Sequence, residues 1–105
     1  MPDSTPAMTK AAADVLAERA RQISEEGWTA ENDDGYTRNE MARAAACYTL
    51  SAAGIRNRLT MFRYWPFLQD WWKPTTPRRD LVKAGALILA EIERLDRVEA
   101  AEGGA

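Results

Sequence analysis

The chain has 105 residues, of which 46% are apolar, and a formal net charge of −2. This length suits one domain with a small core, and the weakly acidic balance argues against general nucleic-acid binding. The absence of histidine excludes Ser-His-Asp and Cys-His catalysis, histidine-ligated zinc and a histidine general base.

The first predicted element is a helix over residues 10–26. Thr9 stands at the N-cap position, and Gly27 is a natural end because glycine accepts the left-handed conformation. Apolar residues recur at spacings of three and four and predict the inner face: Ala12, Val15, Leu16, Ala20 and Ile23. We expect residues 1–8 and 100–105 to be flexible tails around a single helical domain over residues 9–99.

A polar loop is predicted over residues 28–36, followed by a second helix over 38–53. Thr37 and Glu40 match the S/T-x-x-E capping box, and Gly54 marks the end. The predicted inner stripe of this helix consists mainly of small residues, which let another backbone come close: Met41, Ala44, Ala45, Tyr48 and Ala52.

Residues 54–76 form a long aromatic and basic segment, in which periodicity does not decide the structure. Thr76 and Pro77 then predict the start of a third helix over 77–99. Its apolar seam contains Leu81, Gly85, Ile88, Ile92 and Leu95, and we expect Gly85 to approach the alanines of the second helix. The predicted fold is therefore all-α, with three main helices. The seam offers more apolar surface than one small helix covers, which predicts a homo-oligomer.

Charge and aromatic residues are segregated along the chain. Residues 54–83 contain seven bases and two acids, whereas the flanking segments are acidic, and six of the nine aromatic residues lie in the same stretch. Guanidinium groups bind phosphate and indole rings stack on bases. The predicted ligand-binding residues for a phosphate-containing small molecule are Trp71, Trp72, Lys73, Arg78, Arg79 and Lys83. A purely structural role is the competing interpretation, with aromatics anchoring the segment and bases pairing with acids.

Carboxylates are the remaining candidates for metal chemistry. Glu25, Glu40 and Asp80 would hold a magnesium ion if the protein were an enzyme. Glu40 also has a capping role available, and Asp80 lies in the first turn of a helix, where an acid favours the dipole. We therefore predict no catalytic residue, no metal and no cofactor. Cys47 is the single cysteine, so no intrachain disulfide forms, and no apolar run approaches a membrane span. These features predict a cytoplasmic protein.

Two stretches of the chain carry a family resemblance. One runs from Glu18 through Gly27-Trp28-Thr29 to Asp33-Asp34, and the other from Trp71-Trp72-Lys73-Pro74 through Arg78-Arg79 to Asp96. With both stretches, the chain resembles a family of small phage and prophage proteins that has no settled activity. The resemblance covers about residues 14–97 and implies a bacterial host cytoplasm and an accessory phage role.

The helical layout is also similar to MazG-type nucleoside triphosphate pyrophosphohydrolases. Those enzymes hold magnesium with E-x-x-E on one helix and E-x-x-D on the next. Here Glu40 is followed by Arg43 where the second acid should be, and Asp80 is followed by Lys83 in place of an acid. Glu93 and Asp96 do fit E-x-x-D but lie late in the third helix.

Three functions follow from these observations. The first is a non-enzymatic phage module that binds a nucleotide or nucleotide signal and sequesters it in anti-defence. The second is a magnesium-dependent nucleotide pyrophosphohydrolase. The third is a protein–protein interaction module anchored by tryptophan and arginine side chains.

Overall fold

A computed structural model describes residues 7–103 of the chain and shows an all-α fold, as the sequence predicts. Within these residues there is no strand. Three longer helices, α1 (Lys10–Glu26), α3 (Glu40–Ala52) and α5 (Pro77–Gly103), are joined by segments that contain α2 (Ala30–Asp33), α4 (Arg58–Tyr64) and the 3-10 turn η1 (Gln69–Trp71). In the same part of the chain, no helix is long and apolar enough to cross a membrane.

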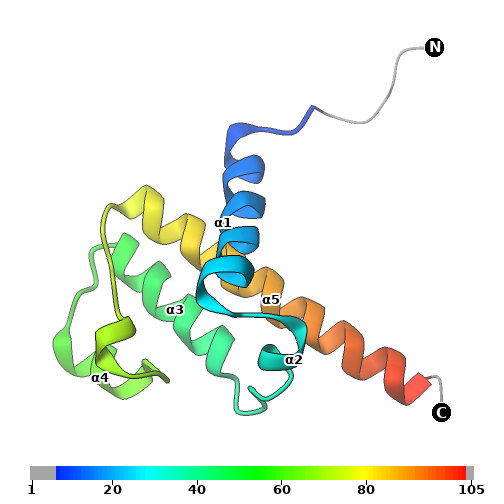
Figure 1. Cartoon of the computed structure of the whole chain (residues 1–105). Helices are drawn as coiled ribbons and strands as arrows, with labels where there is room; N and C mark the ends of the chain where they lie inside the picture. Colours follow the sequence, from blue (N-terminus) through cyan, green and yellow to red (C-terminus); the bar gives the residue numbers. More distant parts are fainter. Residues whose placement is uncertain (1–6, 104–105) are drawn as a thin grey trace.

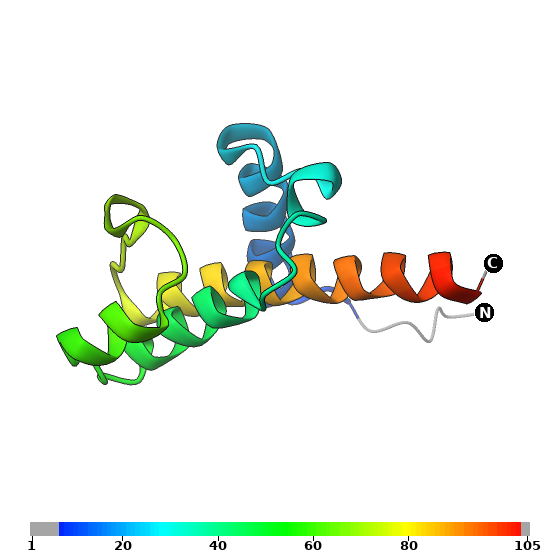
Figure 2. The ribbon, with the colours of Figure 1, turned by 90° about the horizontal axis from the view of Figure 1, so that it is seen from below.

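Helix α5 is the scaffold of the molecule. Figure 1 shows α3 running antiparallel beside its amino-terminal half and α1 crossing it. Seen from below, α1 stands across α5, and the carboxyl-terminal part of α5 extends beyond both partners (Figure 2). α5 continues to Gly103, past the predicted end at 99, so most of the predicted tail over 100–105 is helical. Residues 1–6 and 104–105 of the predicted tails lie outside the described residues.

The helix boundaries follow local capping signals. Thr9 Oγ1 accepts a hydrogen bond from Ala12 N at 3.1 Å, and Gly27 ends α1 with φ of 73°. Thr76 Oγ1 accepts from Arg79 N at 3.2 Å at the start of α5. The predicted capping box at Thr37 is wrong. The N-cap of α3 is Asn39, with φ of 64°, and the Glu40 carboxylate accepts from Arg38 N instead.

The core lies between α3 and α5 and is rich in small residues. It consists of Trp28, Met41, Ala44, Ala45, Tyr48, Ala84, Leu87 and Ala90. The predicted inner stripe of the second helix is therefore largely confirmed. Alanine side chains on both helices allow α3 and α5 to approach closely. The contact with α3 that was predicted for Gly85 is therefore made by Ala84 and other core residues of α5. Gly85 faces α1, where an added Cβ would lie 3.2 Å from the Cγ atoms of Val15.

The inward face predicted for the other two long helices is wrong except at Val15 and Gly85, which pack on each other. On α5, Leu81, Ile88, Ile92 and Leu95 are about half exposed. On α1, Leu16 and Ile23 are exposed, whereas the buried side chains are those of Glu18, Arg19 and Gln22. The polar face of α1 points inward because each buried charge meets an opposite charge from another part of the chain.

Candidate functional site

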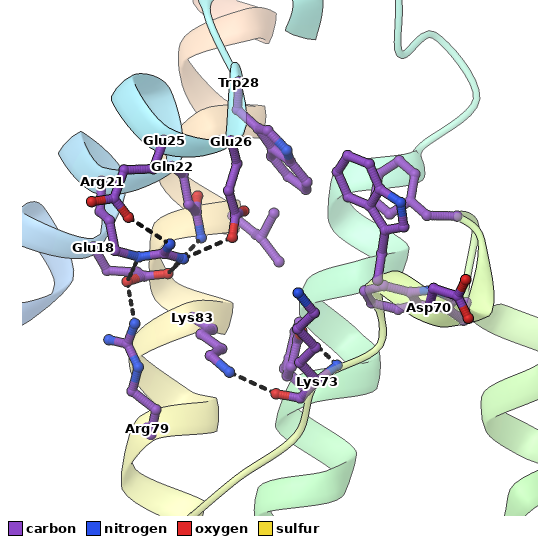
Figure 3. A pocket seen from close by; sticks show the side chains of 15 residues that line it. Glu18, Arg21, Gln22, Glu25, Glu26, Trp28, Asp70, Lys73, Arg79 and Lys83 are labelled. Carbon is purple, nitrogen blue, oxygen red and sulfur yellow. Dashed lines mark hydrogen bonds and ion pairs between the residues drawn. The ribbon is translucent and has the colours of Figure 1, made fainter.

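A cavity of about 670 Å³ lies between α1, α3, α5 and the aromatic segment 54–76. Figure 3 shows it from close by, with the ionic side chains of α1 and α5 on one side and the aromatic segment on the other. Its volume falls in the range of small-molecule sites, roughly 300–1,000 Å³. The lining side chains come from four parts of the chain, so only the tertiary structure creates this space.

Aromatic rings form the apolar wall of the cavity. Trp28, Tyr48, Trp65, Phe67 and Trp71 all line it. The rings hold one another in edge and tilted contacts, including Tyr48–Trp65 at 5.6 Å and Trp28–Phe67 at 5.4 Å between centroids. These contacts anchor the aromatic segment to the core. Among the lining rings, Trp71 keeps 48% of its surface exposed and remains free to stack on a ligand.

The ionic wall is organised around Glu18, whose side chain is 1% exposed. Arg21 Nη2 lies 2.8 Å from Glu18 Oε2, and Arg79 binds the other carboxylate oxygen. Arg21 also pairs with Glu25 at 3.2 Å and Glu26 at 2.9 Å. Burial alone would raise the pKa of the Glu18 carboxyl, but the hydrogen bonds from Arg21 and Arg79 outweigh it and lower this pKa. Glu18 is therefore a charged anchor that positions both arginines.

Two lysines of the cavity make no salt bridge within the described chain. Lys83 Nζ donates to the Lys73 carbonyl oxygen at 2.6 Å and lies 5.4 Å from the centre of the Tyr48 ring. Burial, assisted by the nearby charge of Arg79, lowers the pKa of Lys83. Burial also raises the pKa of Tyr48 to about 12, so its hydroxyl stays protonated. An anion in the cavity would relieve the unfavourable environment of the Lys83 ammonium.

The residues predicted from the sequence do not all meet in one place. Trp71, Lys73, Arg79 and Lys83 line this cavity. Arg78 lines a neighbouring hollow of about 330 Å³ and pairs with Asp14 at 2.9 Å. Trp72 lines a third hollow and packs on Tyr48, with ring centres 4.8 Å apart, so it holds the aromatic segment in place. Two of the four predicted basic residues are neutralised, because Arg78 pairs with Asp14 and Arg79 pairs with Glu18.

The acids named for the enzymatic alternative serve three separate structural roles. Glu25 pairs with Arg21, and Glu40 caps the turn before α3. Asp80 is fully buried, where it accepts from Thr75 N at 2.8 Å and from Ser51 Oγ at 3.4 Å. Across residues 7–103, no group of three or more acidic or cysteine side chains is placed to hold a metal ion.

Sequence reasoning missed the contribution of α1 to the cavity. Glu18, Arg21 and Gln22 line it, although apolar periodicity assigned the opposite face of this helix to the interior. The sequence did contain one signal for this polar face, because Glu18 and Gln22 are four residues apart and therefore lie on the same side of the helix.

Comparisons of this chain with known protein families, with curated proteins and with solved structures find no match.

Proposed function

We propose that this protein is a non-enzymatic binding module that holds a small ligand with a planar ring and a phosphate group, such as a nucleotide. The observation that carries this proposal is the cavity, which has an aromatic wall and contains two lysines without ionic partners, Lys73 on the aromatic segment and Lys83 on α5. The ring would stack on Trp71, and the phosphate would lie between Lys73 and Lys83. Arg79 and Arg21 would act at longer range, since Glu18 already neutralises part of their charge.

The resemblance to small phage and prophage proteins suggests where such binding would be used. A phage protein in the host cytoplasm gains from sequestering a nucleotide signal of host defence, and sequestration needs affinity without turnover. Magnesium plays no part in this proposal, because the three acids that α1 contributes to the cavity are paired with Arg21.

A thermal-shift screen tests the proposal. The panel contains inorganic phosphate, nucleoside mono-, di- and triphosphates and cyclic nucleotides, each with and without magnesium. A ligand at 100 times its Kd stabilises a protein by about 2.7 kcal/mol. We expect at least one nucleotide to stabilise the protein without magnesium and to be recovered intact. Release of pyrophosphate would favour the enzymatic alternative, and no stabilisation by any compound would contradict ligand binding.

Two variants then locate the ligand. Lys83→Gln removes a charge-assisted contact, so we expect a loss of about 1.5–3 kcal/mol, or tenfold or more in affinity. Trp71→Ala should cost about 1–3 kcal/mol by removing the stacking ring. Lys10→Gln and Phe62→Ala are the matched controls, because both side chains are exposed outside the cavity. Wild-type affinity in both cavity variants, measured by titration calorimetry, would place the ligand elsewhere.

A further inference from the structure

A hollow of about 420 Å³ lies between α4, the end of α3 and residues 65–74. We call it the α4 hollow. Trp65 and Phe67 line both this hollow and the larger cavity, so the two spaces share these rings. Most of its lining is apolar and consists of Met61, Phe62, Trp65, Phe67, Trp72 and Pro74. This volume and this lining are typical of a site for a small molecule.

The charge of the α4 hollow is entirely positive. Its charged lining residues are Arg56 and Arg58, and the lining contains no acid. Residues 51–69 contain three arginines and no acid at all. Every arginine of α1 and α5 forms a salt bridge, whereas Arg56 and Arg58 form none within residues 7–103. The described part of the chain therefore leaves this positive charge without a counter-charge, beside a group of aromatic rings.

The hydrogen bonds of the lining leave both guanidinium groups available to a ligand. Arg56 Nε donates to the Ser51 carbonyl oxygen at 3.3 Å, which holds this side chain at the end of α3. Within residues 7–103, the Nη nitrogens of Arg56 and the whole guanidinium group of Arg58 have no hydrogen-bond partner. Ser51 Oγ already donates to Asp80 at 3.4 Å, so few uncharged polar groups remain in the lining.

We propose that the α4 hollow binds a small apolar carboxylate, at a site separate from the nucleotide cavity. The apolar body lies against the rings of Phe62 and Trp65, and the carboxylate lies between Arg56 and Arg58. The planar fork of a guanidinium group matches the two oxygens of a carboxylate. The sugar hydroxyls of a nucleotide would find few partners here, so the lining favours an apolar body with one charged group.

Titration calorimetry with two matched probes tests the charge of the ligand. Naphthalene-1-acetate carries a carboxylate, and naphthalene-1-acetamide has the same ring with a neutral amide. We expect the acid to bind about tenfold more tightly than the amide, because hydrogen bonds to a charged group are the stronger ones. This preference should shrink as the salt concentration rises. Equal affinity for the two probes, or no binding of either, would overturn the proposal.

Substitutions of exposed residues locate the probe. Arg58→Gln should lower the affinity for the acid about tenfold and leave the affinity for the amide unchanged, whereas Phe62→Ala should weaken both probes. Arg63→Gln is the matched control, because Arg63 is another exposed arginine of α4 that does not line the hollow. Lys83→Gln should leave both affinities unchanged, since Lys83 lines the other cavity.

Two results with these variants would reject the proposed site. The first is an Arg58→Gln protein that keeps the preference for the acid, or an Arg63→Gln protein that loses it equally. The second is weaker binding of the acid by Lys83→Gln, which would place the probe in the nucleotide cavity. Circular dichroism checks that each variant keeps its helices.

Discussion

Arg19 joins three parts of the chain through one guanidinium group. Its nitrogens donate to Glu93 of α5, to the Trp28 carbonyl oxygen and to Asp33 of α2, each at 3.1 Å. Asp33 is fully buried, and the second oxygen of its carboxylate has no hydrogen-bond partner. Burial raises the pKa of Asp33, although the charge of Arg19 opposes this shift. Arg19 therefore offsets the free-energy cost of burying the Asp33 carboxylate.

At this scale we predict a large effect of Arg19→Met. The substitution keeps apolar volume but leaves Asp33 as a buried charge without a partner, which costs about 3–5 kcal/mol in the free energy of unfolding. Arg97→Met is the matched control, because the Arg97–Asp34 pair is substantially exposed and should contribute no more than about 1 kcal/mol. Urea denaturation measures both. An equal loss in the free energy of unfolding for the two variants would show that the buried Arg19–Asp33 pair contributes no more than the exposed Arg97–Asp34 pair.

The two long helices α1 and α5 meet where one of them has no side chain. Gly85 lies in the interior of α5, where glycine costs about 1 kcal/mol relative to alanine in an isolated helix. A methyl group there would lie 3.2 Å from both Cγ atoms of Val15, which is a tight contact. Gly85 therefore allows α1 to cross α5 closely, and this crossing sets one wall of the cavity.

The element-scale prediction is that Gly85→Leu destabilises the protein by about 1–3 kcal/mol through overpacking against α1. Val15→Ala should recover part of that loss in the double variant, because it removes the two methyl groups that the new side chain meets. Thermal unfolding of the two single variants and the double variant gives the coupling energy. Additive effects would mean that Gly85 and Val15 do not determine the crossing.

In the molecule as a whole, buried ion pairs connect α1 to α2 and α5. Glu18 is the clearest case, because it links its own helix to α5 through Arg79, 61 positions along the chain. Its pKa is lowered in the folded state relative to the ordinary value of 4.5. The stabilisation from this charge is therefore present above pH 4.5 and is lost as the pH falls through the folded-state pKa.

We accordingly predict that the wild-type protein loses more stability on acidification from pH 5 to pH 3 than Glu18→Gln does. The variant is less stable at neutral pH, since Arg79 and Arg21 lose a charged partner, and its stability curve is flatter in acid. Glu31→Gln is the control, because Glu31 is an exposed acid of α2. Chemical denaturation at a series of pH values gives the curves. Parallel curves for wild type and Glu18→Gln would refute the assignment.

The sequence alone determined where α1 and α5 begin and where α1 ends. Thr9, Gly27 and Thr76 act through hydrogen bonds and backbone angles within a few residues, so their effects are local and readable. The same holds for the small residues of α3, which are buried as predicted. The concentration of aromatic and basic residues in 54–83 also pointed to the region that forms one wall of the cavity.

Only the tertiary structure decided which face of α1 and of α5 points inward. Apolar periodicity assigned Leu16, Ile23, Ile88 and Ile92 to the interior, and the structure leaves them exposed. The buried face of α1 is polar because its charges find partners far away in sequence, which no local pattern reveals. The basic segment likewise predicted a more positive site than the structure contains, because Arg78 and Arg79 pair with acids of α1. Burial of a charge depends on a partner in space, whereas a cap depends on neighbours along the chain.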